Sequence, residues 1–202
     1  SDCDICPKDC KVNRLKNEIA ACYSGREPVV SSYCIHHGEE PGLSGSDEFS
    51  NDNGIGNIFF GNCNLRCVYC QNYEISQNHK AEKKNEVTRE RLAEMMIELH
   101  NKNVNAIGFV SPTHFVPQIV SAVKIAVENG LNLPLVYNTN SYDSVRVLKL
   151  LEGIFDIYLH DIKYSEDEYG YNYSKIKNYV SNSRTAIAEM HRQVGSDLII
   201  ED

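Results

Sequence analysis

The chain has 202 residues and a formal net charge of −8 at pH 7, with 24% charged and 42% hydrophobic residues. This composition excludes a wholly disordered chain and predicts an ordinary packed core, while the acidic balance argues against a nucleic-acid partner, which would require clustered lysine and arginine side chains. No apolar run approaches the roughly 20 residues of a membrane span, and the first residues lack the basic and apolar segments of a secretion signal, so we expect a cytoplasmic protein with no membrane partner.

Residues 1–53 are predicted to form a separate segment rich in cysteine, glycine and serine, ahead of a second region over 54–202. Apart from a short amphipathic helix near 12–21, we expect loop throughout this first segment. Within it, Cys34 is expected to be a plain buried residue, although with His36 and His37 nearby it could substitute for one metal-ligating cysteine. Glu39 and Glu40 are expected to lie in a solvated loop.

All eight cysteines lie in the first 70 residues of the chain. Clustered cysteines without a secretion signal indicate metal ligands rather than disulfides. The first four follow the spacing Cys-x2-Cys-x3-Cys-x11-Cys, which suits zinc and a second iron–sulfur cluster equally well. These four are Cys3, Cys6, Cys10 and Cys22.

From residue 54 onward, apolar runs alternate with stretches of helical periodicity. The run at 57–60 predicts a first strand, and the charge-rich stretch at 80–86 predicts a solvated surface. Thr88 is expected to cap a helix whose apolar side chains recur every three or four residues and face inward. These side chains are Leu92, Met95, Met96 and Leu99.

A second helix is predicted to begin near Pro117, which favours a first turn, and to end at Gly130. A third is predicted to open at Asp143 and to end at Gly153, and two further helical pieces to end near Gly195. The inward residues of the second helix are expected to be Ile119, Val123, Ala126 and Val127. The intervening strands are predicted at 105–110, 133–137 and 154–159, with another beginning at 198–200.

Strands separated by helices of this length imply right-handed βαβ units and a parallel sheet. A closed barrel of eight such units needs about 250 residues, which is more than this chain contains. The sequence therefore predicts an α/β fold, an open or partial barrel that stops after four to five units, and we favour a fragment of a longer barrel.

A second group of cysteines, Cys63, Cys67 and Cys70, follows the first predicted strand with the spacing Cys-x3-Cys-x2-Cys. Three thiolates on one short loop can hold a [4Fe–4S] cluster and leave one iron without a protein ligand. An iron of this kind can bind a substrate or a cofactor. Structural zinc would require a fourth ligand, and no histidine or cysteine lies immediately downstream.

The residues around this triplet resemble the signature of radical S-adenosylmethionine enzymes. The wider sequence is similar to uncharacterised homologues of pyruvate formate-lyase activating enzyme, and the similarity covers nearly the whole chain. The signature itself reads Cys63-Asn64-Leu65-Arg66-Cys67-Val68-Tyr69-Cys70-Gln71-Asn72. The other matching stretches lie at 6–14, 37–41, 58–60, 71–76 and 156–159.

The resemblance implies a partial barrel of six βα units, the last of which are missing here. Cys63, Cys67 and Cys70 would hold the cluster, and S-adenosylmethionine would chelate its open iron. One electron from reduced flavodoxin or ferredoxin would then produce a 5′-deoxyadenosyl radical that abstracts a hydrogen atom. The hydrogen donor implied by analogy is a glycine of a protein substrate. The alternatives are a peptide- or cofactor-modifying enzyme, and a non-catalytic iron–sulfur or zinc protein.

The resemblance also implies residues that bind S-adenosylmethionine. Tyr69 is expected to pack near the adenine. The family's Gly-Gly-Glu-type stretch is replaced by 109–114, where Ser111 and Thr113 would accept hydrogen bonds from the ammonium group and His114 is a further candidate. The remaining candidates follow the third and fourth strands of this region, and they are Asn138, Thr139, Asn140, Asp161 and Lys163.

Overall fold

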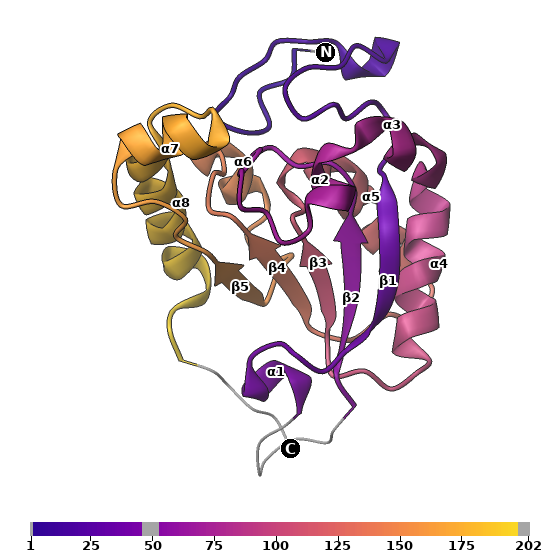
Figure 1. Ribbon diagram of the computed structural model, residues 1–202. Coiled ribbons are helices and arrows are strands. Elements are labelled where there is room, and N and C mark those ends of the chain that lie inside the picture. Colours follow the sequence, from indigo (N-terminus) through magenta and orange to yellow (C-terminus); the bar gives the residue numbers. More distant parts are fainter. Residues whose placement is uncertain (1, 46–52, 198–202) are drawn as a thin grey trace.

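The structure is a computed structural model that describes residues 2–45 and 53–197 (Figure 1). Its centre is a five-stranded sheet with the strand order β1-β2-β3-β4-β5. Strands β2 to β5 are parallel, and β1 pairs with β2 in the antiparallel direction. The strands are β1 (Val30–His36), β2 (Ile55–Phe60), β3 (Ile107–Val110), β4 (Leu135–Thr139) and β5 (Ile157–His160). The α/β fold is thus confirmed, with a sheet that is parallel except for β1.

The longer helices follow the parallel strands, and α4 and α8 pack directly against the sheet (Figure 1). They are α4 (Arg89–His100), α5 (Val116–Glu128), α6 (Val145–Leu150), α7 (Asp167–Ser174) and α8 (Tyr179–Val194). The short elements are α1 (Pro41–Ser44), α2 (Tyr73–Gln77) and α3 (His79–Glu82), with 3-10 turns η1 (Arg14–Lys16), η2 (Lys83–Asn85) and η3 (Thr113–Phe115). None of the described helices is long and apolar enough to cross a membrane.

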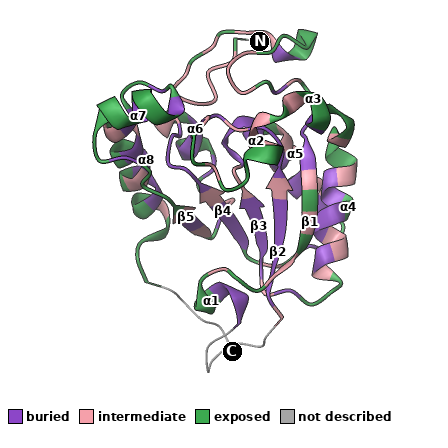
Figure 2. Ribbon diagram, in the orientation of Figure 1, coloured by how far each residue is buried: buried purple, intermediate pink, exposed green. Residues whose placement is uncertain are grey.

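The main hydrophobic core lies between the sheet and these helices, as the buried strands in Figure 2 show. Alternate strand residues such as Ile58, Phe109 and Tyr137 point toward the helices and are fully buried. Because successive strand residues face opposite sides, their neighbours Phe59, Val110 and Asn138 face the other side of the sheet. That other side carries the cavity described below.

Helix α4 is confirmed in its N-cap and in its inward face. The Thr88 hydroxyl accepts a hydrogen bond of 3.1 Å from the backbone N–H of Arg91, which satisfies one free donor of the first turn. The predicted apolar stripe of this helix is buried, namely Leu92, Met95, Met96 and Leu99. Burial of a side chain of this size contributes about 1.5–3 kcal/mol, so the stripe fixes α4 on the sheet.

Helix α5 is confirmed with one correction. Pro117 lies in its first turn, and Gly130 follows its end with a φ of 96°, a left-handed conformation that favours glycine. Ile119, Val123 and Ala126 are buried, but Val127 is 55% exposed. Val127 follows Ala126 directly, and the turn of about 100° per residue carries it out of the buried stripe.

The first segment contains a strand where only loop was predicted. Strand β1 pairs with β2 along its length, with one register shift between Val30 and Ser32, so this part of the chain belongs to the sheet. Cys34 lies on this strand and is exposed rather than buried. The helix expected near 12–21 is absent among the described residues, and a single 3-10 turn, η1, takes its place. The division of the chain at residue 53 stays a prediction.

The stretch at 80–86 forms α3 and η2 and is mostly exposed, as predicted. Within it only Glu82 is buried, accepting hydrogen bonds from Ser31 Oγ and Asn85 Nδ2. The start of the next helix is corrected by one residue. Helix α6 is preceded by Ser144 at its N-cap, because the Asp143 carboxylate turns inward to the core instead. The two helical pieces after β5 are confirmed as α7 and α8, and the strand expected at 198–200 lies outside the described residues.

Candidate functional site

A cavity of about 620 Å³ lies against the face of the sheet that α4 and α5 leave free. Its walls come from the ends of four parallel strands and from the loop after β2. In a parallel sheet all carboxyl ends lie at one edge, which is where ligands of such folds bind. Ten of the predicted site residues line this cavity: Cys63, Cys67, Cys70, Tyr69, Ser111, Asn138, Thr139, Asn140, Asp161 and Lys163.

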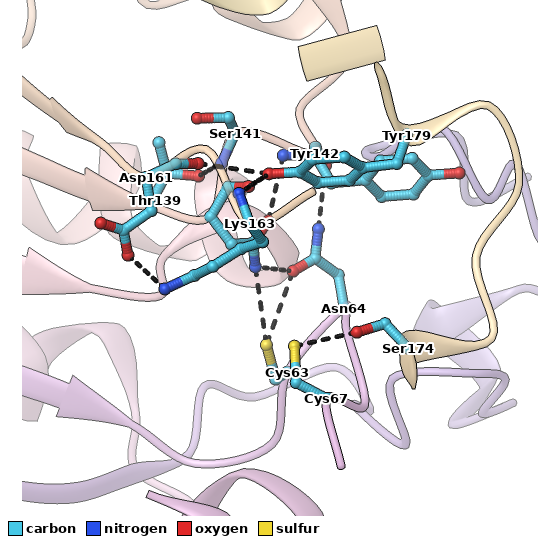
Figure 3. Close-up of polar contacts among 11 residues, drawn as sticks. Cys63, Asn64, Cys67, Thr139, Ser141, Tyr142, Asp161, Lys163, Ser174 and Tyr179 are labelled. Atoms are coloured by element: carbon cyan, nitrogen blue, oxygen red, sulfur yellow. Dashed lines mark hydrogen bonds and ion pairs between the residues drawn. The ribbon is translucent and has the colours of Figure 1, made fainter. Parts of the chain in front are cut away.

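The three thiols of the β2 loop each contact a hydrogen-bonding group, and Figure 3 shows the contact of Cys67 with Ser174. Cys63 Sγ accepts from the backbone N–H of Leu65 at 3.3 Å. Cys67 Sγ accepts from Ser174 Oγ at 3.0 Å, and Cys70 Sγ lies 3.2 Å from Ser76 Oγ. Donors of this kind stabilise sulfur that carries negative charge, as it does in a metal thiolate.

The chemistry of this set fits an iron–sulfur cluster. Burial raises the pKa of Cys63 to about 12, and the neighbouring charges of Cys67 and Cys70 raise it as well. Three thiolates therefore coexist here only beside a positive group, which a metal centre provides. In the described parts of the chain no three His, Cys, Asp or Glu side chains yet surround one point as metal ligands, so binding requires the thiols to turn toward the centre.

The loop after β4 is joined to the cysteine loop by side-chain amides. Asn140 Nδ2 donates to Asn64 Oδ1 at 2.8 Å, and Asn64 Nδ2 donates to the carbonyl of Tyr142 at 2.9 Å. The carbonyl of Asn140 accepts from the Tyr179 hydroxyl at 2.8 Å. Asn140 and Asn64 are both buried. These contacts hold two segments, 76 residues apart in the sequence, in fixed register at the mouth of the cavity.

A buried carboxylate lies beneath the same loop. Asp143 accepts hydrogen bonds from Tyr137 OH at 2.9 Å and from Thr139 Oγ1 at 2.5 Å. Burial raises the pKa of Asp143, while these hydrogen bonds oppose the shift. The carboxylate orients Thr139, whose hydroxyl faces inward rather than toward solvent, and so it fixes the end of β4.

Thr113 and His114 do not line the large cavity. Both are buried in the turn η3, where Thr113 Oγ1 lies 3.4 Å from Thr139 Oγ1. His114 Nε2 is bonded at 3.0 Å to the carbonyl of Gly61. Ser111 has a φ of 57°, a left-handed conformation that turns the chain behind the sheet directly after β3. The structure therefore places Thr113 and His114 outside the large cavity, although Thr113 contacts Thr139.

Two charged residues mark the end of β5. Lys163 Nζ pairs with Asp161 Oδ2 at 2.6 Å, with side chains 32% and 58% exposed. Burial lowers the pKa of Lys163, but the hydrogen bond and charge of Asp161 outweigh this and raise it overall. The lysine is therefore a cation at the cavity wall. Tyr69, across the mouth, is 53% exposed and lies edge-on to Tyr164.

The sequence did not identify two residues at the far wall of the cavity. Glu39 was expected in a solvated loop, but it lines the cavity and accepts a hydrogen bond of 2.8 Å from Asn57 Nδ2. His36 lies 4.0 Å from the same carboxylate. Both follow from β1, and the alternating apolar residues Tyr33 and Ile35 are the sequence signal that could have indicated this strand.

The four N-terminal cysteines meet at a separate place. Cys3, Cys6, Cys10 and Cys22 all line a small cavity of about 20 Å³. Ile5, Lys8, Asp9, Arg14 and His114 complete its walls. The same four residues were predicted as a group from their spacing, and the structure brings them together.

Comparison with known proteins agrees with this geometry. The radical SAM superfamily model matches residues 57–198. "Uncharacterized protein MJ0674" of Methanocaldococcus jannaschii is 35% identical over 88% of this chain and 50% of its own length. "Uncharacterized protein MJ0808" of the same organism is 27% identical over 83% of this chain and 50% of its own length. The chain therefore spans about half the length of these relatives.

Proposed function

The chain belongs to the radical SAM superfamily, and we propose that it is an enzyme that binds a [4Fe–4S] cluster and cleaves S-adenosylmethionine reductively. One observation carries this proposal. Three thiols on one loop and polar residues from three strand ends line a single cavity of about 620 Å³. That volume is within the usual range of about 300–1,000 Å³ for a small-molecule site.

When bound, the cluster supplies the electron that splits S-adenosylmethionine into methionine and a 5′-deoxyadenosyl radical. The chain itself positions both ligands. Cys63, Cys67 and Cys70 would hold three irons, so that the fourth faces the cavity. The Lys163 ammonium would attract the carboxylate of S-adenosylmethionine, and the side-chain oxygens near Asn138 would accept from its amino group.

An electron donor needs access to the cysteine loop. Val68, Tyr69 and Tyr73 on and beside this loop are 72%, 53% and 61% exposed. Exposed apolar and aromatic side chains next to a redox centre suit transient contact with a small carrier protein. We propose reduced flavodoxin or ferredoxin as this partner.

The substrate provides the hydrogen atom. Glycyl-radical activation, in which the donor is a glycine of a protein partner, rests on sequence resemblance to activating enzymes and is the narrower form of this proposal. Modification of a peptide or cofactor is the alternative. Glu39 and His36 at the far wall of the cavity offer a polar end where such a substrate would bind.

The test is anaerobic reconstitution followed by electron paramagnetic resonance of the reduced protein, with and without S-adenosylmethionine. We expect a [4Fe–4S] signal that changes when S-adenosylmethionine is added, because the molecule binds the open iron. Cys63→Ala should abolish the signal, whereas Cys34→Ala, which changes an exposed thiol on β1, should leave it intact. A cluster signal indifferent to S-adenosylmethionine would favour a plain electron carrier, and retention of zinc alone would refute the proposal.

A further inference from the structure

The N-terminal cysteines form a compact group held by the backbone. The N–H of Cys3 donates to the carbonyl of Val12 at 3.0 Å, and the N–H of Lys11 donates back to the carbonyl of Cys3 at 2.9 Å. These two bonds close residues 3–12 into a loop that carries three of the four thiols. Cys22 joins them from the following segment, and all four residues line one cavity.

Two buried polar atoms at this cavity lack partners in the described structure. His114 is 2% exposed, and its Nδ1 makes no hydrogen bond. Since its Nε2 faces the carbonyl of Gly61, which can only accept, Nε2 carries the proton and Nδ1 presents a lone pair. Arg14 is 8% exposed, and its Nη2 is likewise unpartnered. Unsatisfied buried groups of this kind are rare and need an explanation, which a bound ion can supply.

We propose that Cys3, Cys6, Cys10 and Cys22 bind one zinc ion. Four thiolates around Zn²⁺ make a complete tetrahedral structural site. The complex carries net negative charge on its sulfurs, which gives the free Nη2 of Arg14 an anionic acceptor. One occupant thus satisfies the unpartnered Nη2 of Arg14.

The size of the cavity favours a single ion over a second iron–sulfur cluster. About 20 Å³ is room for about one water-sized sphere. A [4Fe–4S] cluster has eight heavy atoms and would force the loop open. A single ion requires the thiol side chains to turn inward, since among residues 2–45 and 53–197 they do not yet surround one point.

The site is linked to the large cavity through two residues. Arg14 Nη1 donates to the carbonyl of His114 at 2.6 Å, and His114 reaches the carbonyl of Gly61, two positions before Cys63. An ion that fixes the N-terminal loop would therefore also support the start of the cysteine loop after β2. Its role would be structural, and it needs no part in the reaction proposed above.

The test measures metal content of the protein in a form that cannot bind the other cluster. The triple variant Cys63→Ser, Cys67→Ser, Cys70→Ser, produced with zinc supplied, should retain about one zinc ion per chain. Adding Cys6→Ser should reduce this at least tenfold, and adding Cys34→Ser instead should leave it unchanged. Because the triple variant lacks the cysteines of the proposed reaction, failure here is distinguishable from failure of that reaction.

A second measurement covers the case in which the Cys6 variant does not fold. Zinc is removed from the triple variant with a chelator and replaced by Co²⁺, whose visible spectrum reports tetrahedral thiolate ligation. We expect the charge-transfer bands of cobalt bound to several sulfurs, displaced by added zinc. The proposal is overturned if the triple variant contains no zinc, if it contains iron and sulfide instead, or if cobalt gives the spectrum of the hydrated ion.

Discussion

Asn140 Nδ2 donates a hydrogen bond of 2.8 Å to Asn64 Oδ1, joining the loop after β4 to the loop that carries the three cysteines. Asn64 is 1% exposed and Asn140 is 7% exposed, so water cannot replace the hydrogen bond between the two side-chain amides. Asn140 Nδ2 also lies 3.7 Å from Cys63 Sγ. The pair therefore sets how the cysteine loop lies against the strand ends.

Asn64→Ala and Asn140→Ala should each lower the free energy of unfolding by about 1–3 kcal/mol, because each leaves a buried amide without its partner. The double variant should lose less than the sum of the two, by about 0.5 kcal/mol or more, since the residues are in contact. Denaturant unfolding of the four proteins measures this coupling. Asn172→Ala, at an exposed position of α7, should cost less than about 0.5 kcal/mol. Strict additivity would contradict the role assigned to the pair.

Asp143→Ala should also destabilise the protein, by about 1–3 kcal/mol, because the buried hydroxyls of Tyr137 and Thr139 lose their acceptor. Asp143→Asn keeps one carbonyl oxygen and should recover part of this loss. Thermal unfolding of both variants provides the comparison. If alanine and asparagine are equally destabilising, the hydrogen bonds are not what the carboxylate contributes.

Ser174→Ala should lower the reduction potential of the bound cluster. Ser174 is fully buried and donates to Cys67 Sγ at 3.0 Å, and a hydrogen bond to a ligating sulfur favours the more negative, reduced state. A redox titration followed by electron paramagnetic resonance measures the shift. Ser181→Ala on α8, away from the cysteines, should leave the potential unchanged. An unchanged potential in Ser174→Ala would show that the Ser174 hydroxyl does not donate to a ligating sulfur.

Much of the fold could be predicted because its strands are short apolar runs and its helices have regular stripes. Strand β4 was predicted to begin at residue 133, two residues before its observed start at Leu135. The prediction was early because Leu133 and Pro134 extend the apolar run before strand pairing starts. Strand β1 was missed because serines, a cysteine and a histidine interrupt its apolar residues. Its place depends on pairing with β2, a distant contact that local pattern does not encode.

The candidate site was predictable to the extent that it follows from parallel topology. Strand ends in such a sheet must lie at one edge, which brought Asn138 and Asp161 near the cysteines. Thr113 was misplaced because its orientation depends on the left-handed conformation of Ser111, an uncommon geometry for serine. Glu39 was missed for a different reason, because it reaches the cavity only once β1 has joined the sheet.

Lys163→Met should weaken binding of S-adenosylmethionine by about fivefold, since a partly exposed charge pair is worth about 1 kcal/mol. Calorimetric titration of the reconstituted protein under anaerobic conditions measures this. Lys177→Met, an exposed lysine away from the cavity, removes the same charge and should not change the affinity. Equal affinities for wild type and Lys163→Met would show that the lysine does not contact the ligand.

Arg192 on α8 should make stability depend on pH in the acidic range. Its guanidinium donates to Glu189 and Glu152. The hydrogen bonds that Glu189 accepts from Arg192 and Gln193 lower its pKa to about 2. The pKa of Glu152 is lowered by the same arginine. A carboxyl whose folded pKa is depressed stabilises the fold above its unfolded pKa of about 4.3, and this contribution disappears as the pH falls toward the folded value.

Arg192→Gln should therefore be less stable than wild type at pH 7, and the difference should shrink between about pH 4.5 and pH 2. Urea unfolding at a series of pH values measures the difference directly. Arg184→Gln, at an exposed position of the same helix, should show no such dependence. If the Arg192 difference were constant across this range, packing of the arginine side chain rather than its ion pairs would account for it, because only the ion pairs titrate with the two carboxyls.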